Sequence, residues 1–356
     1  METKKPFFDS NTTDILKGIA LILMLIHHFF TYPSWWGEGV SYPLIAQAAP
    51  YICAPFRICV PVFCFLTGYV YYFAKEKTFI YSFKKIGSLL VSYWMVFFPV
   101  ALIAVIFVPY RYNLRDFLTE CIAFYCPTMP FCWYVNFYLT MMLLLPLLVR
   151  ILTRSAFFDL AVTVLLIPFF ASLAADPFVE NEIVLQLRDN ITEWMPVALS
   201  GYLCAARGLF FRAKDLESKI LRNKAVRVLF FLLLALSAAA GRFVFPHLQI
   251  TTHRLPVFFI TADTLYAPLF VYAAVRLAGL LPVPFAHRAL AVTGRYSLWM
   301  WFVSCVFYGI TTPLFQPLLY LPKNPLLVLL WGYFLCFVPS LLLEKEKRLF
   351  FSRKMW

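Results

Sequence analysis

The sequence contains few charged residues, because Asp, Glu, Lys and Arg together fill only 14% of its 356 positions. Hydrophobic residues fill 62%, whereas soluble domains have about 45–50%. This shortage of charge excludes a soluble globular protein, since too few polar side chains are present to cover its surface. Lipid is therefore the predicted solvent for most of the chain.

Motifs for cofactors and metals are also lacking. The sequence has no Gly-rich phosphate-binding loop, no dinucleotide-binding glycine pattern and no Cys or His pairs at metal-ligand spacing. Its nine cysteines are scattered through apolar stretches. The net charge of +13 does not indicate nucleic-acid binding, because the basic residues lie in short loops between apolar runs. We therefore expect no permanently bound cofactor, no metal and no nucleic-acid partner.

Long apolar runs predict an all-α, polytopic membrane protein with about ten transmembrane helices, each of about 20 residues. No internal repeat or soluble domain is visible, so residues 1–356 are predicted to form a single membrane domain. The stretch 117–130 is too short to span and predicts a re-entrant or interfacial piece. The predicted spans are 14–32, 52–73, 86–108, 131–150, 156–175, 191–210, 225–246, 255–279, 294–316 and 325–343.

The positions of Lys and Arg predict the orientation of these spans. If the N-terminus is cytoplasmic, 24 of the 31 basic residues fall on the cytoplasmic side. An even number of spans then returns the C-terminus to the same side. The first residues are polar and no small-residue cleavage site follows them, so the first span is expected to remain as an anchor.

The first span carries ionisable residues at both ends. A helix turns 100° per residue, so Asp14, Lys17 and His28 share one stripe, and His28 lies about 16 Å beyond Lys17. This places His28 near the predicted midplane, where an ionisable side chain indicates function by default. Its chemistry suits a general base that removes a proton from a hydroxyl. A buried His satisfied by a backbone carbonyl is the alternative. For His27, which points about 100° away, substrate binding and this structural role are balanced.

The stretch "LKGIALILMLIHHFF" (16–30) places ten residues between Lys17 and His28. This resembles the first-helix signature of the acyltransferase-3 family of integral membrane O-acyltransferases, in which a basic residue, more usually Arg, precedes the His. Thr67 stands where that family's second-helix pattern has Ser. The resemblance covers nearly the whole chain. The other similar stretches are "VPVFCFLTGYVYYF" (60–73), "FCWYVNFYL" (131–139) and "EWMPVALSGYLCAARGLF" (193–210).

Two departures from the family pattern concern the site. In "FKKIGSLLVSYW" (83–94), Lys84 and Lys85 stand near a usual Arg pair, and Ser88 falls where the second Arg is expected. This puts the contacts with acyl-CoA in doubt. In "TGRYSLWMWFVSC" (293–305), Ser304 occupies the step of a usual His, which leaves one fewer titratable group.

The resemblance implies an O-acyltransferase of the cytoplasmic (plasma) membrane. An acyl group, acetyl by this reading, would pass from acyl-CoA to a hydroxyl of a cell-envelope glycan or lipid-linked sugar. His28 would be the general base, and Lys17 would bind donor phosphate or carboxylate or stabilise charge. The alternatives are a transporter or flippase of an envelope intermediate, which the missing inverted repeats disfavour, and a receptor or scaffold without chemistry.

Asp263 and Arg57 are further candidates. Asp263 lies inside the predicted eighth span, where it could orient His28 or pair with a cation. It could equally pair with a helix-packing donor, Arg254 or Arg57. Arg57 could bind an anionic substrate or extend its head group to the membrane interface.

Four more residues are predicted to bind substrate. Lys84 and Lys85 face the predicted cytoplasmic side, where they could attract acyl-CoA phosphates or only fix the topology. Trp133 and Tyr134 begin the fourth span on the outer side. There they could stack on a sugar or belong to the interfacial aromatic belt.

Overall fold

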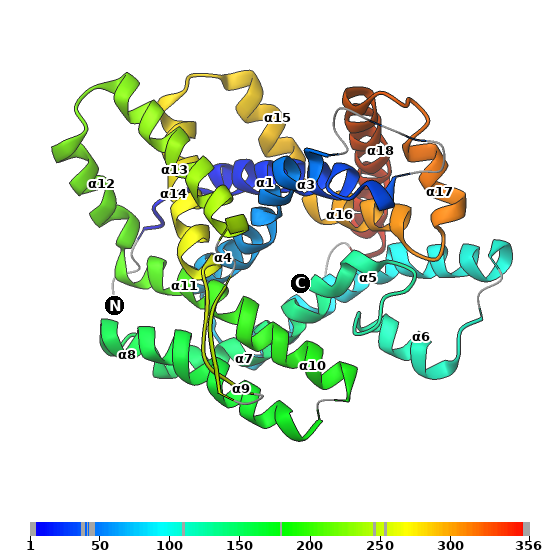
Figure 1. Cartoon of the computed structure of the whole chain (residues 1–356), viewed down its shortest axis with the longest axis horizontal. Helices are drawn as coiled ribbons and strands as arrows, with labels where there is room; N and C mark the ends of the chain where they lie inside the picture. The colour runs from blue at the N-terminus through cyan, green and yellow to red at the C-terminus, as the bar shows by residue number, and fades with distance from the viewer. Residues whose placement is uncertain are drawn as a thin grey trace. The chain divides into compact units, whose positions relative to one another are not determined.

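The computed structural model describes residues 5–36, 40, 42, 47–108, 111–178, 180–244, 247–252 and 255–351 (Figure 1). Helices dominate these residues, which confirms the predicted all-α class. The chain forms two compact units, which are described separately. Unit 1 is Met1–Ala20, Pro55–Thr78 and Leu144–Gly294, and unit 2 is Leu21–Ala54, Phe79–Leu143 and Arg295–Trp356. The prediction of one membrane domain over residues 1–356 stays a prediction.

Two helices pass from one unit into the other. Helix α1 (Ser10–Phe30) contributes its first half to unit 1 and its second half to unit 2, and α7 (Trp133–Ile151) is divided at Leu144. The remaining helices of unit 1 are α4 (Cys59–Tyr72), α8 (Ala156–Ala161), α9 (Ile167–Ala175), α10 (Glu182–Asp189), α11 (Met195–Arg207), α12 (Leu209–Ile220), α13 (Lys224–Val244), α14 (Asp263–Leu280) and α15 (Pro284–Arg295). Two π-helical segments, η4 (Val162–Leu166) and η6 (Asn190–Trp194), and the 3₁₀ turn η5 (Asp176–Phe178) connect them.

Glycines allow α4 and α11 to pack closely in unit 1. A Cβ atom added at Gly68 of α4 would overlap the carbonyl oxygen of Ala198, and one at Gly201 of α11 would overlap that of Phe65. Small residues at such crossings let helix backbones approach in lipid, where dispersion contacts replace the hydrophobic effect. Helix α14 packs against α4, α11 and α13.

The eighth predicted span, 255–279, begins too early. Residues 247–252 and 255–261 form an antiparallel hairpin, β1 (His247–Thr252) and β2 (Leu255–Thr261), with His247 opposite Thr261 and an irregularity after Ile250. β-Branched and aromatic residues are frequent in both segments and favour strands. Helix α14 therefore starts only at Asp263.

Unit 2 is built around α5 (Phe79–Phe107), α16 (Ser297–Cys305) and α18 (Pro325–Phe351). Its buried core includes Tyr93, Phe97, Val135, Trp299 and Phe302. The shorter elements of this unit are η1 (Pro33–Trp35), α3 (Ala49–Cys53), α6 (Leu114–Cys121), η3 (Pro130–Cys132), η7 (Val306–Tyr308) and α17 (Thr312–Leu319). The 3₁₀ segment η2 (Ala54–Ile58) begins in unit 2 and ends in unit 1.

Local sequence explains several helix ends. The Asp9 side chain accepts a hydrogen bond from the backbone N–H of Thr12 at 2.7 Å and caps α1. Hydrogen bonds from the side chain and the backbone of Thr12 lower the pKa of the Asp9 carboxyl. Asn113 and Asn181 cap α6 and α10 in the same way. Gly208, with φ of 62°, ends α11 in the left-handed conformation that glycine adopts without strain.

The structure tests the predicted spans in part. Among the described residues, seven helices are long and apolar enough to cross a membrane, or eight if α15 with α16 and η7 counts as one bent span. The predicted span 156–175 coincides with α8, η4 and α9. The span 294–316 is wrong as one helix, because α15 and α16 meet at a 63° bend and α16 ends at Cys305. The total of ten spans and the cytoplasmic termini remain predictions.

The predicted interfacial stretch 117–130 is held in unit 2 by Glu120, which is fully buried. Its carboxylate accepts hydrogen bonds from Tyr112 Oη (2.8 Å), Thr128 N (2.8 Å) and Thr128 Oγ1 (3.0 Å). Burial raises the pKa of this carboxyl above 4.5, although those hydrogen bonds oppose the shift. Tyr93 donates to the Glu120 carbonyl at 2.9 Å and ties the stretch to α5.

Candidate active site

His28 lies in the last turn of α1 and is only 9% exposed. Its ring stacks on Phe131 of η3, with centroids 4.2 Å apart and planes at 22°. Tyr308 of η7 meets the same imidazole edge-on at 6.3 Å. Helix α1 is continuous over both Lys17 and His28, as their spacing predicts. Unit 2 thus holds the candidate base between aromatic rings that come from distant parts of the sequence.

Hydrogen bonds hold the backbone next to His28 and at Phe131. Trp301 donates its indole N–H to the Phe131 carbonyl at 3.2 Å, and Tyr320 donates its hydroxyl to the Phe29 carbonyl at 2.9 Å. Trp35 lies 5.3 Å from Phe131 between ring centroids. Phe131 and Tyr308 contact the His28 ring, and Trp35 packs against both of them; we call these three residues the aromatic cage.

His27 has polar partners within unit 2. Its Nδ1 lies 2.8 Å from Thr31 Oγ1 and 3.3 Å from the Cys53 carbonyl oxygen. A protonated Nδ1 would donate to the Cys53 carbonyl, whereas a bare Nδ1 would accept from the Thr31 hydroxyl. Either form holds the ring in place, which is what a structural histidine requires.

The first half of α1 lies in unit 1 and carries Lys17. Its Nζ lies 3.5 Å from Asp14 Oδ1, and the Lys17 side chain is 37% exposed. A Cβ atom at Gly18 would overlap the carbonyl oxygen of Leu290, and one at Gly294 would overlap that of Asp14. Close packing of α1 on α15 therefore fixes the helix that presents the Lys17 ammonium.

Asp263 is the first residue of α14 and pairs with Arg242 of α13, with Nε and Oδ1 2.8 Å apart. Both residues are buried, at 4% and 9% exposure. Asp263 therefore pairs with a helix-packing donor, as the alternative predicted, but the donor that the described residues show is Arg242, which is neither of the two predicted donors. Arg254 lies outside the described residues. Because Asp263 belongs to unit 1 and His28 to unit 2, an orienting role for Asp263 stays a prediction.

A family model described as an acyltransferase domain matches residues 11–345 of the chain. The chain belongs to the acyltransferase-3 family. This confirms the resemblance seen in the sequence and shows a multi-pass membrane acyltransferase. Neither the curated proteins nor the solved structures contain a match to it.

A lysine from a distant part of the sequence lies at Ser88, where this acyltransferase departs from the family pattern. Lys84 and Lys85 are exposed in the second turn of α5. One turn further on, Lys347 of α18 donates to the Ser88 carbonyl and Oγ, both at 3.1 Å, and to Ser92 Oγ at 2.7 Å. Lys347 thus brings a cation from the other end of the chain next to Ser88. This contact could not be found from local sequence.

The other departure, Ser304, is fully buried in this acyltransferase, and its hydroxyl donates to the Trp301 carbonyl at 2.7 Å. It stabilises α16 rather than adding a titratable group. Among the described residues, no three His, Cys, Asp or Glu side chains converge as metal ligands.

Trp133 and Tyr134 begin α7 and are half-buried. The Tyr134 ring meets Trp301 edge-on at 5.6 Å, and Trp301 donates to the Phe131 carbonyl. The structure therefore connects Tyr134 to the aromatic cage in unit 2. Arg57 is exposed in η2, at the edge of unit 1. Sequence reasoning missed Trp35 and Tyr308, whose only signal was the general abundance of aromatic residues, and it included Phe131 only as the first residue of the family-like stretch 131–139.

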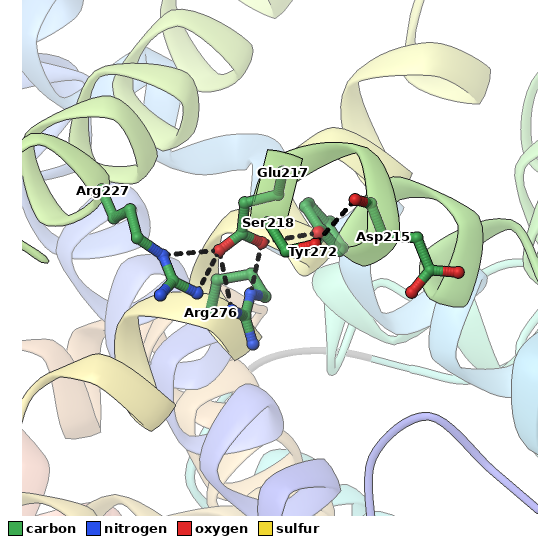
Figure 2. A network of polar contacts seen from close by, with 6 residues as sticks. All are labelled: Asp215, Glu217, Ser218, Arg227, Tyr272 and Arg276. Atoms are coloured by element: carbon green, nitrogen blue, oxygen red, sulfur yellow. Dashed lines mark hydrogen bonds and ion pairs between the residues drawn. The ribbon is translucent and has the colours of Figure 1, made fainter. Parts of the chain in front are cut away.

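Two arginines of the basic stretch 207–227, Arg207 and Arg227, are already paired in this acyltransferase. Arg227 and Arg276 both bind the carboxylate of Glu217, which also accepts from Tyr272 Oη at 2.9 Å (Figure 2). Arg207 is paired with Asp159. The cations of α12 that remain exposed are Arg212, Lys214 and Lys219.

Proposed function

We propose that this acyltransferase transfers an acyl group, acetyl in the first instance, from acyl-CoA to a hydroxyl of a cell-envelope glycan or lipid-linked sugar. The observation that carries the proposal is the place of His28, which is buried in the aromatic cage at the end of α1. Family membership favours this enzyme over a transporter of an envelope intermediate. The cytoplasmic (plasma) membrane is the proposed location.

The reaction needs one base, which takes the proton of the acceptor hydroxyl and later gives it to the leaving group. The neutral imidazole of His28 removes the proton of the acceptor hydroxyl while the oxygen attacks the thioester carbonyl. The carbon–sulfur bond then breaks, and the proton passes from His28 to the leaving thiolate. The products are an O-acyl ester and free CoA. The rings of Phe131 and Tyr308 exclude water, which would otherwise hydrolyse the thioester.

Exposed cationic residues on the predicted cytoplasmic side suit an acyl donor that is an anion, such as acyl-CoA. Lys84 and Lys85 are exposed at the start of α5 in unit 2, and Lys17 is partly exposed on α1 in unit 1. Each could bind a phosphate of acyl-CoA as a point charge. The paired Arg227 and Arg276 are poorer candidates, because Glu217 already neutralises them.

The test uses membranes with radiolabelled acetyl-CoA and an extract of envelope glycans and lipids. His28→Ala at matched expression should lower label in an alkali-labile ester by about 10²–10⁴-fold, the usual contribution of a general base. His287→Ala, on α15, is the matched control and should leave transfer unchanged. Equal transfer by wild type and His28→Ala would remove His28 from the chemistry. No transfer by folded wild type would refute the proposed donor or acceptor.

A further inference from the structure

An apolar groove of about 530 Å³ runs along α8, η4 and α9 in unit 1. Its wall includes Ile151, Phe158, Val162, Leu166, Phe170 and Ile191. It follows the candidate membrane span Ala156–Phe178, and its neighbours Leu160, Leu165 and Leu173 are exposed on the same span. The groove therefore opens toward the lipid that surrounds this span.

Both π-helical segments of unit 1 contribute to the groove. Val162 and Leu166 belong to η4, and Ile191 belongs to η6, which packs against α9. A π-helical turn is rare and occurs often at functional sites, because its extra residue displaces the helix surface. Two such segments along one groove indicate that its shape is built by the fold.

Arg154 lies at one end of the groove and is its only charged lining residue among those described. Its guanidinium lies 5.6 Å from the centre of the Phe158 ring. The carboxylate nearest in sequence, Asp159, is engaged by Arg207 Nε at 3.0 Å and by the backbone N–H of Thr153 at 2.8 Å. Within the described ranges, no carboxylate forms an ion pair with Arg154.

We propose that this groove binds a membrane phospholipid with an anionic headgroup. One acyl chain lies along the apolar wall, and the phosphate binds Arg154 on the side that the distribution of basic residues assigns to the cytoplasm. The guanidinium fork matches phosphate oxygens, and the Phe158 ring holds the guanidinium in position. The volume of the groove is within the range of sites that bind small ligands, about 300–1,000 Å³. A polar soluble ligand fits less well, because every residue of the groove wall other than Arg154 is apolar.

The test reconstitutes the full chain in nanodiscs of phosphatidylglycerol and phosphatidylcholine. A trace of phosphatidylglycerol with a photoreactive group in its acyl chain is crosslinked, and labelled peptides are identified by mass spectrometry. A phosphatidylcholine probe with the same chain reports contact that does not depend on the headgroup charge. Arg154→Gln removes the cation, and Arg150→Gln removes an exposed cation of α7 that does not line the groove. Ala171→Phe fills the groove and keeps Arg154.

Phosphatidylglycerol should label residues 151–171 about fivefold less in Arg154→Gln, as expected for one interfacial basic residue. Arg150→Gln should leave this labelling unchanged, and Ala171→Phe should lower it for both probes. Each variant must remain monodisperse and melt near the wild-type temperature. Equal labelling by both probes, unaffected by Arg154→Gln, would mean that only bulk lipid contacts the groove and would overturn the proposal.

Discussion

The substitution Glu217→Gln tests the polar network of Figure 2. In the wild type the Glu217 carboxylate accepts from Arg227 Nε at 2.8 Å, from Arg276 Nε and Nη2, both at 2.7 Å, and from Tyr272 Oη at 2.9 Å. Glutamine keeps the size of the side chain but removes its charge. Two guanidinium groups then remain near one another without the anion that holds them.

The expected loss of stability follows from burial. The Glu217 side chain is 4% exposed, and removing one partner of a buried ion pair costs about 3–5 kcal/mol. The Arg227 and Arg276 side chains are 25% and 14% exposed, so water screens them in part. We therefore expect the lower end of the range, about 3 kcal/mol, which is a factor of about 150 in the unfolding equilibrium.

The same network predicts a dependence on pH. Burial alone would raise the pKa of Glu217, but hydrogen bonds from Arg276, Arg227 and Tyr272 outweigh it and lower the pKa to about 2. Because the folded pKa lies below the usual 4.5, this stabilisation is present above pH 4.5 and is lost as the pH falls toward 2. Glu217→Gln should lack this component.

Thermal unfolding of the purified chain in nanodiscs at pH 7 measures the effect. Asp215→Asn is the matched control, because Asp215 lies on the same helix, is exposed and loses the same charge. It should change the free energy of unfolding by no more than about 0.5 kcal/mol. A Glu217→Gln variant as stable as Asp215→Asn would refute the reasoning.

Three further predictions concern other buried groups. Since burial raises the pKa of Glu120, stability should fall as the pH rises above 4.5, and Glu120→Gln should flatten this slope in melting curves; a flat wild-type profile would contradict it. Gly294→Ala should destabilise by about 1–3 kcal/mol through overlap with α1, whereas Gly279→Ala, with no atom near its Cβ, should not; equal melting temperatures would count against the packing. Asp263→Asn should cost about 3–5 kcal/mol, and adding Arg242→Met should recover part of this loss; additive losses would exclude the pair.

Apolar runs predicted the helices well where the chain stays apolar without interruption. The run 156–175 matches three consecutive helical segments, because lipid requires every backbone group to be bonded within the helix. The end of α16 at Cys305 was not predicted, because the sequence stays hydrophobic beyond it, over Val306–Tyr308. The hairpin at 247–261 was also missed, because hydrophobic strands and helices have the same composition over short runs.

For the site, the sequence could predict His28 as the candidate base but not its surroundings. An ionisable residue in an apolar helix is visible in one dimension. Phe131 and Tyr308 lie more than a hundred residues away from it and from each other along the chain, so only tertiary structure shows that they meet His28. The pairing of Asp263 with Arg242 was missed for a similar reason, since the two lie on different helices.

The contact between Phe29 and Tyr320 affects how the protein is made. The two residues are 291 positions apart, and at about 5–20 residues per second a ribosome needs roughly 15–60 s to complete the interval. During that interval the first helix is already synthesised, and the partners of its last turn are added in stages: Thr31 at once, Phe131 later, and Tyr308 and Tyr320 only near its end. A nascent chain that ends just before Tyr308 carries His28 and Phe131 but not the third ring of the aromatic cage. In the proposed mechanism, the enclosure of His28 is therefore completed only near the end of translation, and a truncated product retains the family's first-helix signature without that enclosure.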